Sequence, residues 1–528
     1  MMHRRQDRRW WCLEMSEWRR RLRLLWVMLG FMLWFDWIGS AGASIHEYKH
    51  ESFFSQSGAY FFHGGSEGLY ASSNNLPQNP DKPNAGRSFI KFESITLKRT
   101  KESAEKQNRM HSSTGLVEAI IVEVKDRERI GGSYLGSDSI CCTQELSKKG
   151  HCKVGEVIIH NDADSPDWPH RIKISFEANY EETTLSPQTV YVNNTGMYYL
   201  YFMFCDDELK GTIISGSTVW KNPDGYLPGK MAPLLTFYGV MSLAFLGLGL
   251  MWLLRFMQFW KNLTQLHYHI TTVIALGMLE MAFWYFDYSS LNSTGFRPMG
   301  VTIWAITLTA VKKTLSRLLL LVVSMGYGVV RPTLGSMASK VLLLGAVYFV
   351  ASEALELYEH LGNINDFAGK TKLALVLPVV FLDAGFILWI FSSLSDTLEK
   401  LQVRRSMAKL ELYRKFTNSL AVFVVISIAW IGYELYFNAT DPLSELWRIA
   451  WLIPAFWAIL AYTLLAVICV LWAPSKNPTR YAYSEEAGDD FDEEAVSLTS
   501  TAVKVAGDIR KVSGAITIRE DIEEDKRE

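Results

Sequence analysis

The sequence lacks several motifs that would indicate an enzyme. It has no Cys-x-x-Cys pair, so a thiol oxidoreductase is not indicated, and no serine hydrolase is expected either. The nearest approach to a phosphate-binding loop, Gly225–Lys230, is one residue short and is followed by Met231, where serine or threonine is needed. We therefore expect no catalytic residues, no enzyme activity and no cofactor.

The chain also carries little net charge. Its 53 basic and 55 acidic residues give a formal charge of -2 at pH 7. No basic patch with interleaved aromatic residues lies outside the apolar segments, so no nucleic acid partner is expected. His46, His50 and His63 are predicted to be surface side chains rather than ligands, and no metal site is expected.

Cysteine is scarce, with six residues in 528. Cys12 lies in an amino-terminal leader and Cys469 in an apolar segment. The four others, all in a polar region, are Cys141, Cys142, Cys152 and Cys205. A bond between the adjacent first two would be strained, so we expect each of them to bridge to one of the other two, in either order. Such bonds need an oxidising compartment; the alternative is four reduced, buried thiols.

Residues 1–43 are predicted to be a signal peptide. Four arginines between Arg19 and Arg23 precede the short apolar run Leu24–Phe35, and Ala41-Gly42-Ala43 follows it. A basic stretch, a short apolar stretch and small residues, in that order, are typical of a secretory signal. The alternative is a retained amino-terminal anchor.

Residues 44–229 are predicted to form a β-sandwich. From Ile172 to Ala178, apolar residues alternate with polar ones, as in a half-buried strand. The other strand candidates are Phe89–Leu97, Val117–Val124, Thr189–Val192, Met197–Phe204 and Thr212–Trp220. Several short strands separated by turn residues favour two packed sheets.

Residues 230–473 are predicted to be a bundle of seven membrane-spanning helices, which makes the chain a multi-pass α-helical membrane protein. Each apolar block is long enough to cross a hydrocarbon core of about 30 Å as a helix. The blocks are about Ala232–Leu254, Leu266–Tyr285, Val301–Val323, Val341–Leu361, Leu373–Leu394, Phe416–Phe437 and Trp447–Trp472.

The third block carries Lys312, Lys313 and Arg317 near its middle. Each cation costs about 3 kcal/mol at the bilayer centre, so these side chains need partners. Acids within or beside other blocks are Glu280, Glu353, Glu356, Asp383 and Glu434. Two interpretations stay open: a polar cavity that accepts a phospholipid headgroup or an ion, and a set of structural ion pairs that fixes helix register.

Loop charges predict the orientation. The link after the fifth block is basic, from Lys400 to Lys415, and the alternate loops are poor in lysine and arginine, so this link is expected in the cytosol. The amino-terminal domain is then lumenal and the carboxyl terminus cytosolic. The glycosylation candidates Asn193, Asn292 and Asn438 fall on the lumenal side, whereas the sequon at Asn262 falls on the cytosolic side.

The tail, residues 474–528, is acidic and is predicted to be disordered. It is either a docking site for cytosolic coat or sorting proteins or a solvating tail. Its last residues, Lys526-Arg527-Glu528, resemble a Lys-x-Glu coat-binding signal, which makes Lys526 and Glu528 sorting-signal candidates.

Three groups of motifs resemble one family. They are Gly196–Leu200 with Asn222–Gly229; Gly277–Glu280 with Ala310–Lys313 and Ser324–Pro332; and Leu471–Ser475 with Arg480–Ser484. In this order they resemble the GOLD-domain seven-transmembrane proteins, also called the lung seven-transmembrane receptor family, and within it the transmembrane protein 87 branch. The match covers the membrane half throughout and the lumenal half more loosely.

The resemblance implies a GOLD-like lumenal sandwich, residence in the Golgi or trans-Golgi network, and a role in endosome-to-Golgi retrieval or lumenal cargo handling. The expected partners of this protein are membrane lipids, including a bound phospholipid, a lumenal protein or lipid-linked cargo, and cytosolic coat or sorting proteins. Ion conduction involving the acid at Glu280 is the first alternative. A seven-transmembrane receptor ranks last, because seven helices alone do not determine function.

Overall fold

The computed structural model describes residues 41–42, 44–71, 86–110, 115–133, 139–150, 152–160, 167–177, 180–327, 329–330, 335, 337–361, 369–441 and 444–474. The predicted signal peptide, apart from residues 41–42, lies outside the described residues. So does the tail beyond Pro474, including Lys526 and Glu528.

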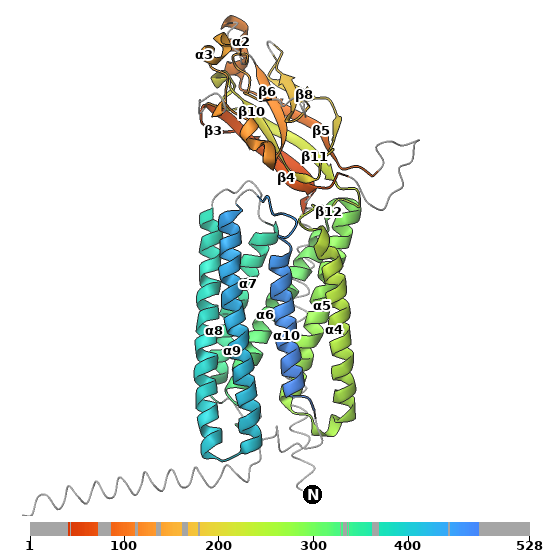
Figure 1. Ribbon diagram of the computed structural model, residues 1–528, viewed down its shortest axis with the longest axis vertical. Coiled ribbons are helices and arrows are strands. Elements are labelled where there is room, and N and C mark those ends of the chain that lie inside the picture. The colour runs from red at the N-terminus through yellow and green to blue at the C-terminus, as the bar shows by residue number, and fades with distance from the viewer. Residues whose placement is uncertain are drawn as a thin grey trace, which may run out of the picture.

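The amino-terminal half is a sandwich of two five-stranded antiparallel sheets (Figure 1). One sheet has the order β3-β4-β10-β6-β7, and the other has the order β2-β11-β5-β8, with β9 also paired to β5. The strands are β2 Ile45–Ser52, β3 Phe54–Gln56, β4 Ala59–Leu69, β5 Phe89–Lys98, β6 Leu116–Glu123, β7 His170–Ser175, β8 Glu182–Leu185, β9 Gln188–Tyr191, β10 Gly196–Phe204 and β11 Ile213–Lys221. Two short helices, α2 Lys101–Met110 and α3 Gln144–Lys148, lie at the end far from the membrane half.

The sandwich core confirms the period-two prediction. On β10, Tyr198, Leu200, Phe202 and Phe204 are all buried at 1% exposure or less. The five separate strand candidates match observed strands to within one residue at each end. The candidate at Ile172 ends earlier, because β7 stops at Ser175.

Residue pattern did not predict strands β2, β3 and β4. β2 reads Ile-His-Glu-Tyr-Lys-His-Glu-Ser and buries only Tyr48 fully. β4 contains three glycines, which are depleted in strands. Their pairing with β11 and β10 is therefore set by the tertiary fold rather than by local preference.

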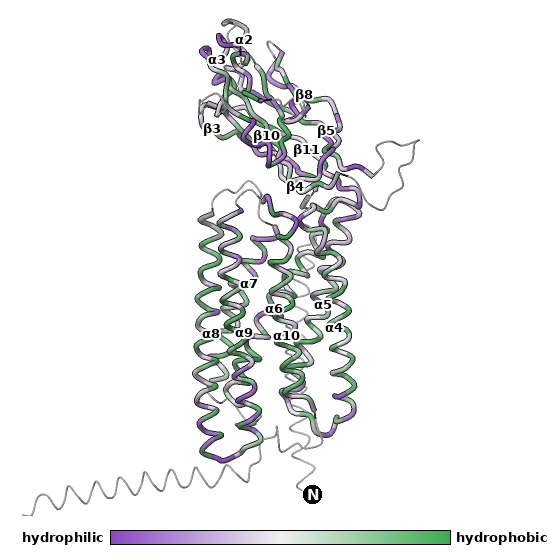
Figure 2. Tube along the Cα trace, in the orientation of Figure 1, coloured by the Kyte–Doolittle hydropathy of each residue, from purple (hydrophilic) through white to green (hydrophobic). Residues whose placement is uncertain are grey.

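The membrane half contains seven long helices side by side (Figure 1). They are α4 Ala232–Gln258, α5 Gln265–Thr294, α6 Met299–Ser324, α7 Met337–Leu361, α8 Gly369–Val403, α9 Met407–Thr440 and α10 Leu452–Leu471. Six of them are apolar enough to cross a membrane by length and composition. The seventh, α6, contains the three cations, and its 26 residues are also enough to span a membrane. Figure 2 shows apolar residues along the helices and polar residues in the sandwich and at the far end of α8 and α9.

Several helices are longer than the apolar blocks that predicted them. α8 has 35 residues and α9 has 34, which is about 50 Å each at 1.5 Å per residue, against a hydrocarbon core of about 30 Å. Their additional turns carry polar side chains at the end opposite the sandwich. In the last block, Trp447–Trp451 forms turns, and the helix begins only at Leu452.

Gly68, Gly229 and Trp447 form a close contact between the sandwich and the bundle. The amide of Gly229 donates to Gly68 O at 2.9 Å, and Trp447, between α9 and α10, packs over both glycines. A Cβ at Gly68 would lie 2.6 Å from the Trp447 ring, and a Cβ at Gly229 would lie 2.6 Å from Gly68 O. Tyr70 packs edge-on against Trp447, with ring centroids 5.2 Å apart. The absence of a side chain at these two positions therefore permits the close approach.

Two asparagines form a second connection. Asn222, after β11, donates through its amide nitrogen to Gly68 O and Leu227 O, at 3.2 and 2.8 Å. Asn292, near the end of α5, accepts from the amide of Leu227 and donates to Asp224 O, both at 3.2 Å. The linker between sandwich and α4 is thus held from both sides.

A short strand pair completes the junction. β12, Phe296–Arg297, pairs antiparallel with β1, Ala41–Gly42. These two β1 residues immediately precede Ala43, where the signal peptide is predicted to be removed. Cleavage at Ala43 would remove this strand from the mature chain.

Candidate functional site

The predicted polar interior is built around α6. This helix packs against α5, α7 and α8, so its three cations can each reach a different neighbour. Lys313 and Arg317 are four residues apart and share a face, whereas Lys312 points about 100° away around the helix. The structure gives each cation its own acid.

Lys312 pairs with Glu280 of α5. Both residues are buried, at 8% and 3% exposure. The Lys312 ammonium also lies 5.8 Å from the centre of the Phe245 ring of α4. Because an unpaired charge would be strongly unfavourable here, this pair holds α5 and α6 in one register.

Lys313 pairs with Glu356 of α7. The Nε2 atom of His360, one turn later, lies 3.6 Å from the other oxygen of Glu356. The His360 ring also packs against Trp284 of α5, with centroids 4.6 Å apart. The Glu356 carboxylate thus contacts one side chain of α6 and one of α7.

Arg317 pairs with Asp383 of α8. Its Nε and Nη2 atoms donate to the two carboxylate oxygens, Nη2 to Oδ2 at 3.1 Å. The guanidinium carbon lies 4.7 Å from the centre of the Tyr348 ring of α7. The side chains of Arg317 and Asp383 remain 30% and 31% exposed, so this pair lies nearer the bundle surface than the Lys312 pair.

Two predicted acids form no ion pair with a cation in the described part of the chain. Glu353 accepts a hydrogen bond from Thr307 Oγ1 at 2.9 Å, and its Oε2 atom is buried with no hydrogen-bond partner among the described residues. Glu434 lies on α9 and accepts from Trp457 Nε1 of α10 at 3.2 Å. α9 does not pack closely against α6, so Glu434 lies apart from the three cations of α6.

Sequence reasoning missed a fourth charged pair. Asp287, fully buried on α5, lies 3.8 Å from Nε of Arg297 and accepts a hydrogen bond from Thr302. The apolar block was expected to end at Tyr285, which placed Asp287 in a loop. The signal that could have found it is the apolar spacing of Trp284, Tyr288 and Leu291, which continues the buried helix face.

The disulfides resolve the alternative left open by the sequence. Cys141 is bonded to Cys205, and Cys142 to Cys152. The first bond joins the segment after η1 (Val124–Arg129) to the end of β10, and the second closes a short loop around α3. The prediction that the adjacent cysteines bridge to different partners is confirmed.

The three glycosylation candidates lie at the sandwich end of the molecule. Asn193 and Asn438 are exposed, one before β10 and the other near the end of α9. Asn292 is only partly exposed, and the nitrogen that would carry a glycan already donates to Asp224 O. The structure therefore gives Asn292 a role in the junction.

The prediction that His46 is a surface residue is wrong. Its side chain is 9% exposed, and Nε2 lies 3.0 Å from Oε1 of buried Glu67. His63 is also largely covered, by Tyr199 and Tyr201, with ring centroids 5.8 and 5.4 Å away. Local sequence could not show this, because the covering residues come from distant strands.

His46-Glu47-Tyr48-Lys49-His50 has the His-Glu-x-x-His spacing of zinc proteases, but the structure excludes that role. Zinc proteases place the two histidines one turn apart on a helix, whereas here they lie on strand β2. At about 3.3 Å per residue, four residues of strand separate their backbones by about 13 Å. The described residues contain no group of three or more histidine, cysteine or acidic side chains able to hold a metal ion.

The comparisons match the membrane half. Residues 233–479 match the family described as "GOST, seven transmembrane domain". The chain is 38% identical to transmembrane protein 87B of Mus musculus over 274 residues, 51% of this chain and 48% of that protein. It is 34% identical to transmembrane protein 87A of Xenopus tropicalis over 303 residues, 56% of this chain and 54% of that protein.

A more distant match is Membrane protein PTM1 of Saccharomyces cerevisiae, 25% identical over 286 residues, 51% of this chain and 53% of that protein. The chain thus matches about half the length of these curated relatives. The matched half contains α6 and every cation and acid of the interior. Together with the seven-helix bundle under a β-sandwich, these matches show that the membrane half of the chain is similar to the GOST seven-transmembrane domain and to transmembrane proteins 87A and 87B.

Proposed function

We propose that this protein acts in vesicular trafficking at the Golgi or trans-Golgi network, handling a lumenal protein or lipid-linked cargo and supporting endosome-to-Golgi retrieval. The single observation that carries the proposal is the tight junction between sandwich and bundle at Gly68, Gly229 and Trp447. A cargo bound to the sandwich can bias the bundle only if the two parts move together, and close packing provides that coupling.

The distribution of charge and cysteine supports the orientation that this function needs. The sandwich contains both disulfides, which suit an oxidising lumen. The basic α8–α9 connection lies at the opposite end of the bundle, as expected for a cytosolic face (Figure 1). Trp472, just after α10, packs against the first turns of α9 at that same end, so a tail that follows it would be available to coat or sorting proteins.

The partly exposed cations offer a place for a phospholipid headgroup. The side chain of Lys313 is 41% exposed although it pairs with Glu356, and Arg317 is 30% exposed. Both share one face of α6, and a phosphate could contact them without breaking either pair. Structural ion pairs and a lipid site are therefore compatible.

The test uses cells that lack the protein, complemented with Trp447→Ala, which loosens the junction but leaves both halves in place. We expect slower return of a recycling marker from endosomes to the Golgi than with wild-type protein. Gly247→Ala is the control, since a Cβ at Gly247 meets no atom within 4 Å. Normal retrieval with a correctly located Trp447→Ala protein and with a sandwich deletion would refute the proposal.

A second candidate, a cation channel, is favoured by Glu353. Its Oε2 atom is buried and lacks a hydrogen-bond partner among the described residues, and a buried carboxylate oxygen is suited to a passing cation. Purified protein in liposomes should then conduct cations, with lower flux in Glu353→Gln and in Glu280→Gln than in Glu434→Gln. Flux equal to that of empty liposomes would exclude this function.

A further inference from the structure

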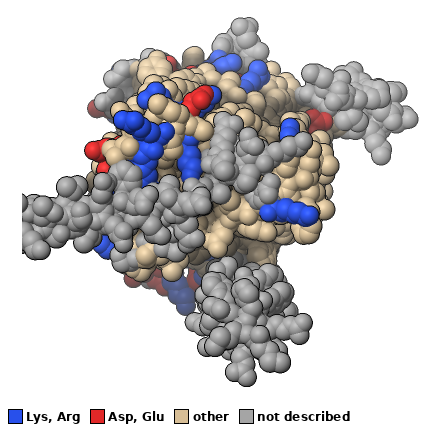
Figure 3. Space-filling view, turned by 90° about the horizontal axis from the view of Figure 1, so that it is seen from below, with Lys and Arg blue, Asp and Glu red and all other residues tan. Residues whose placement is uncertain are grey.

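One strongly charged surface has no role in the interior site. We call it the basic hairpin: residues Asp396–Lys415, which comprise the last turns of α8, the connection at Arg404–Ser406 and the first turns of α9. It contains six basic and three acidic residues. It lies at the end of the bundle opposite the sandwich (Figure 1), and a view of that end shows lysine and arginine outnumbering acids on the visible surface (Figure 3).

Most of its cations are not neutralised by the described part of the chain. Lys400, Arg404, Arg405 and Arg414 are exposed, and none forms an ion pair with another described residue. Lys415 pairs with Glu411 at 2.7 Å, but on an exposed helix face such a pair contributes little. The hairpin therefore presents positive charge that a partner could bind.

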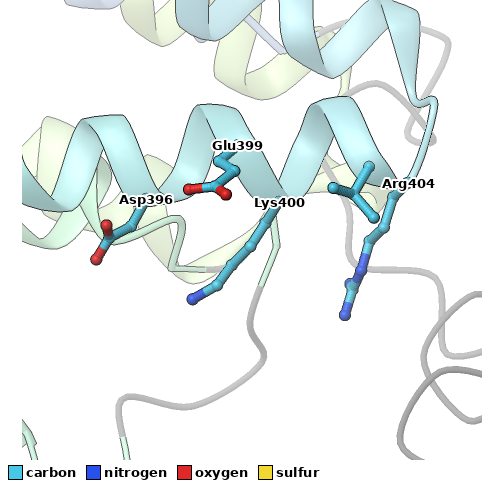
Figure 4. Close-up of a pocket in the computed structure, with 5 residues that line it drawn as sticks. Asp396, Glu399, Lys400 and Arg404 are labelled. Carbon is cyan, nitrogen blue, oxygen red and sulfur yellow. The ribbon is translucent and has the colours of Figure 1, made fainter. Parts of the chain in front are cut away.

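The hairpin also has a defined shape. A hollow of about 340 Å³ is lined by Asp396, Glu399, Lys400, Val403 and Arg404. Figure 4 shows Lys400 and Arg404 projecting from the same side of α8. The lining mixes carboxylates with cations. Such a surface suits an acidic polypeptide, which offers carboxylates to the cations and backbone N–H donors to the carboxylates, better than a lipid phosphodiester, which offers only acceptors.

The chain leaves the bundle directly beside this surface. α10 ends at Leu471, and the next residue, Trp472, is fully buried. Its ring packs edge-on against Tyr413 and Phe416 of α9, with centroids 6.2 and 5.0 Å apart. These contacts fix the start of the tail at the first turns of α9, within the length of the basic hairpin.

The tail then provides the opposite charge. Residues Glu485–Glu494 contain seven acidic side chains and no basic one. Glu485 lies eleven positions after Pro474, a distance of at most about 40 Å when the chain is extended. Arg405 is eight residues from Tyr413, about 12 Å along a helix. The acidic segment can therefore reach every cation of the hairpin.

We propose that the acidic segment Glu485–Glu494 docks on the basic hairpin of the same molecule. A tether of this length gives an effective concentration in the millimolar range, so even a weak charge interaction is populated. The hairpin extends nine residues past the apolar block, about 13 Å beyond the hydrocarbon core, which is at or past the outer edge of the headgroups. Its tip is thus placed for a polypeptide rather than for a lipid phosphate.

Docking would have a regulatory consequence. If the tail recruits sorting proteins, as the proposed function holds, docking covers the acidic segment, and a competing partner exposes it. This consequence depends on the proposed function. The docking itself depends only on the opposite charges of the two segments, on the length of the tail and on the position of Trp472. Cross-linking of the purified protein therefore tests it without any trafficking assay.

The experiment uses the full chain in phosphatidylcholine nanodiscs, treated with a carbodiimide that joins carboxylates to lysine amines, and maps the products by mass spectrometry. We expect acids of residues 485–494 to couple to Lys400 and Lys415. Lys261, between α4 and α5, and Lys340, in the first turn of α7, are internal controls, since both are exposed at the same end of the bundle. Coupling should fall strongly near 1 M salt, where the screening length is about 3 Å.

Matched variants decide between specific docking and a mobile tail. Arg404→Gln with Arg405→Gln, and separately Asp489→Asn with Asp490→Asn, should each reduce coupling to Lys400 several-fold. Arg255→Gln, which removes an exposed cation from the last turn of α4, should not. Equal coupling to Lys261 and Lys340 would overturn the proposal. So would the absence of coupling. In that case, retention of phosphatidylserine by wild-type protein in mixed nanodiscs, lost on Arg404→Gln with Arg405→Gln, would make the hairpin a lipid site.

Discussion

Arg317 of α6 and Asp383 of α8 form a forked ion pair, in which Nη2 donates to Oδ2 at 3.1 Å and Nε donates to the other carboxylate oxygen. Removing one partner leaves the other charge inside the bundle. Because both side chains are about one-third exposed, we expect Arg317→Ala or Asp383→Ala alone to destabilise the protein by about 2 kcal/mol, between the values for buried and surface pairs.

The double variant, Arg317→Ala with Asp383→Ala, should be less destabilised than the sum of the two single variants. Thermal unfolding of the full chain in detergent, followed by tryptophan fluorescence, measures all three. Glu434→Ala is the control, since its carboxylate accepts a hydrogen bond from the Trp457 indole and forms no ion pair with a described residue. Strict additivity of the two single effects would contradict direct pairing.

The two disulfides close loops of very different length. The Cys141–Cys205 bond spans 64 residues and the Cys142–Cys152 bond spans 10. Loop-closure entropy predicts stabilisation of about 4 kcal/mol for the long loop and about 3 kcal/mol for the short one. Replacing both cysteines of a pair by serine should therefore lower the melting temperature of the sandwich more for Cys141 and Cys205. The reverse order would show that local packing around α3 dominates.

Close approach at the junction depends on Gly229. A Cβ there would lie 2.6 Å from the carbonyl oxygen of Gly68 and from the Trp447 ring, so Gly229→Ala must push the sandwich and bundle apart. Overpacking of this kind destabilises by about 1–3 kcal/mol. Hydrogen exchange should increase in the segment around Trp447 but remain unchanged in the β10 core. The matched control is again Gly247→Ala, and equal exchange in the two variants would contradict this role of the glycine.

The sandwich should lose stability in acid through His63. Burial, with a smaller effect of nearby His46, lowers the pKa of His63 to about 4 from its ordinary value of 6.5. The unfolded chain therefore binds a proton at higher pH than the folded chain does. The stabilisation is complete above pH 6.5 and is lost as the pH falls toward 4, by up to about 3 kcal/mol.

His63→Gln removes this titration. The melting temperature of wild-type protein should fall more steeply between pH 7 and 4 than that of the variant, since the other titrating groups, including His46 and Glu67, are present in both. Parallel curves would mean that His63 titrates at its ordinary pKa and is open to water.

Residue pattern alone was sufficient for the parts of the fold that depend on local periodicity. The strands of the sandwich that alternate cleanly, such as β10, and all seven apolar blocks were predictable, because burial in a sheet or a bilayer imposes a period on the sequence. The need for partners to Lys312, Lys313 and Arg317 was also predictable, because an unpaired cation in the membrane is too costly.

Residue pattern was thus enough to predict a seven-helix bundle, with acids near its buried cations, beneath a disulfide-bonded sandwich. It did not show which residues meet: that Cys141 bonds to Cys205, that Glu280 rather than Glu434 faces Lys312, that Asp287 joins Arg297, and that Trp472 places the start of the tail beside α9. The physical reason is the separation along the chain over which each interaction acts. Periodicity records the environment of each residue along the chain, whereas pairing depends on helix rotation and packing between segments far apart in sequence.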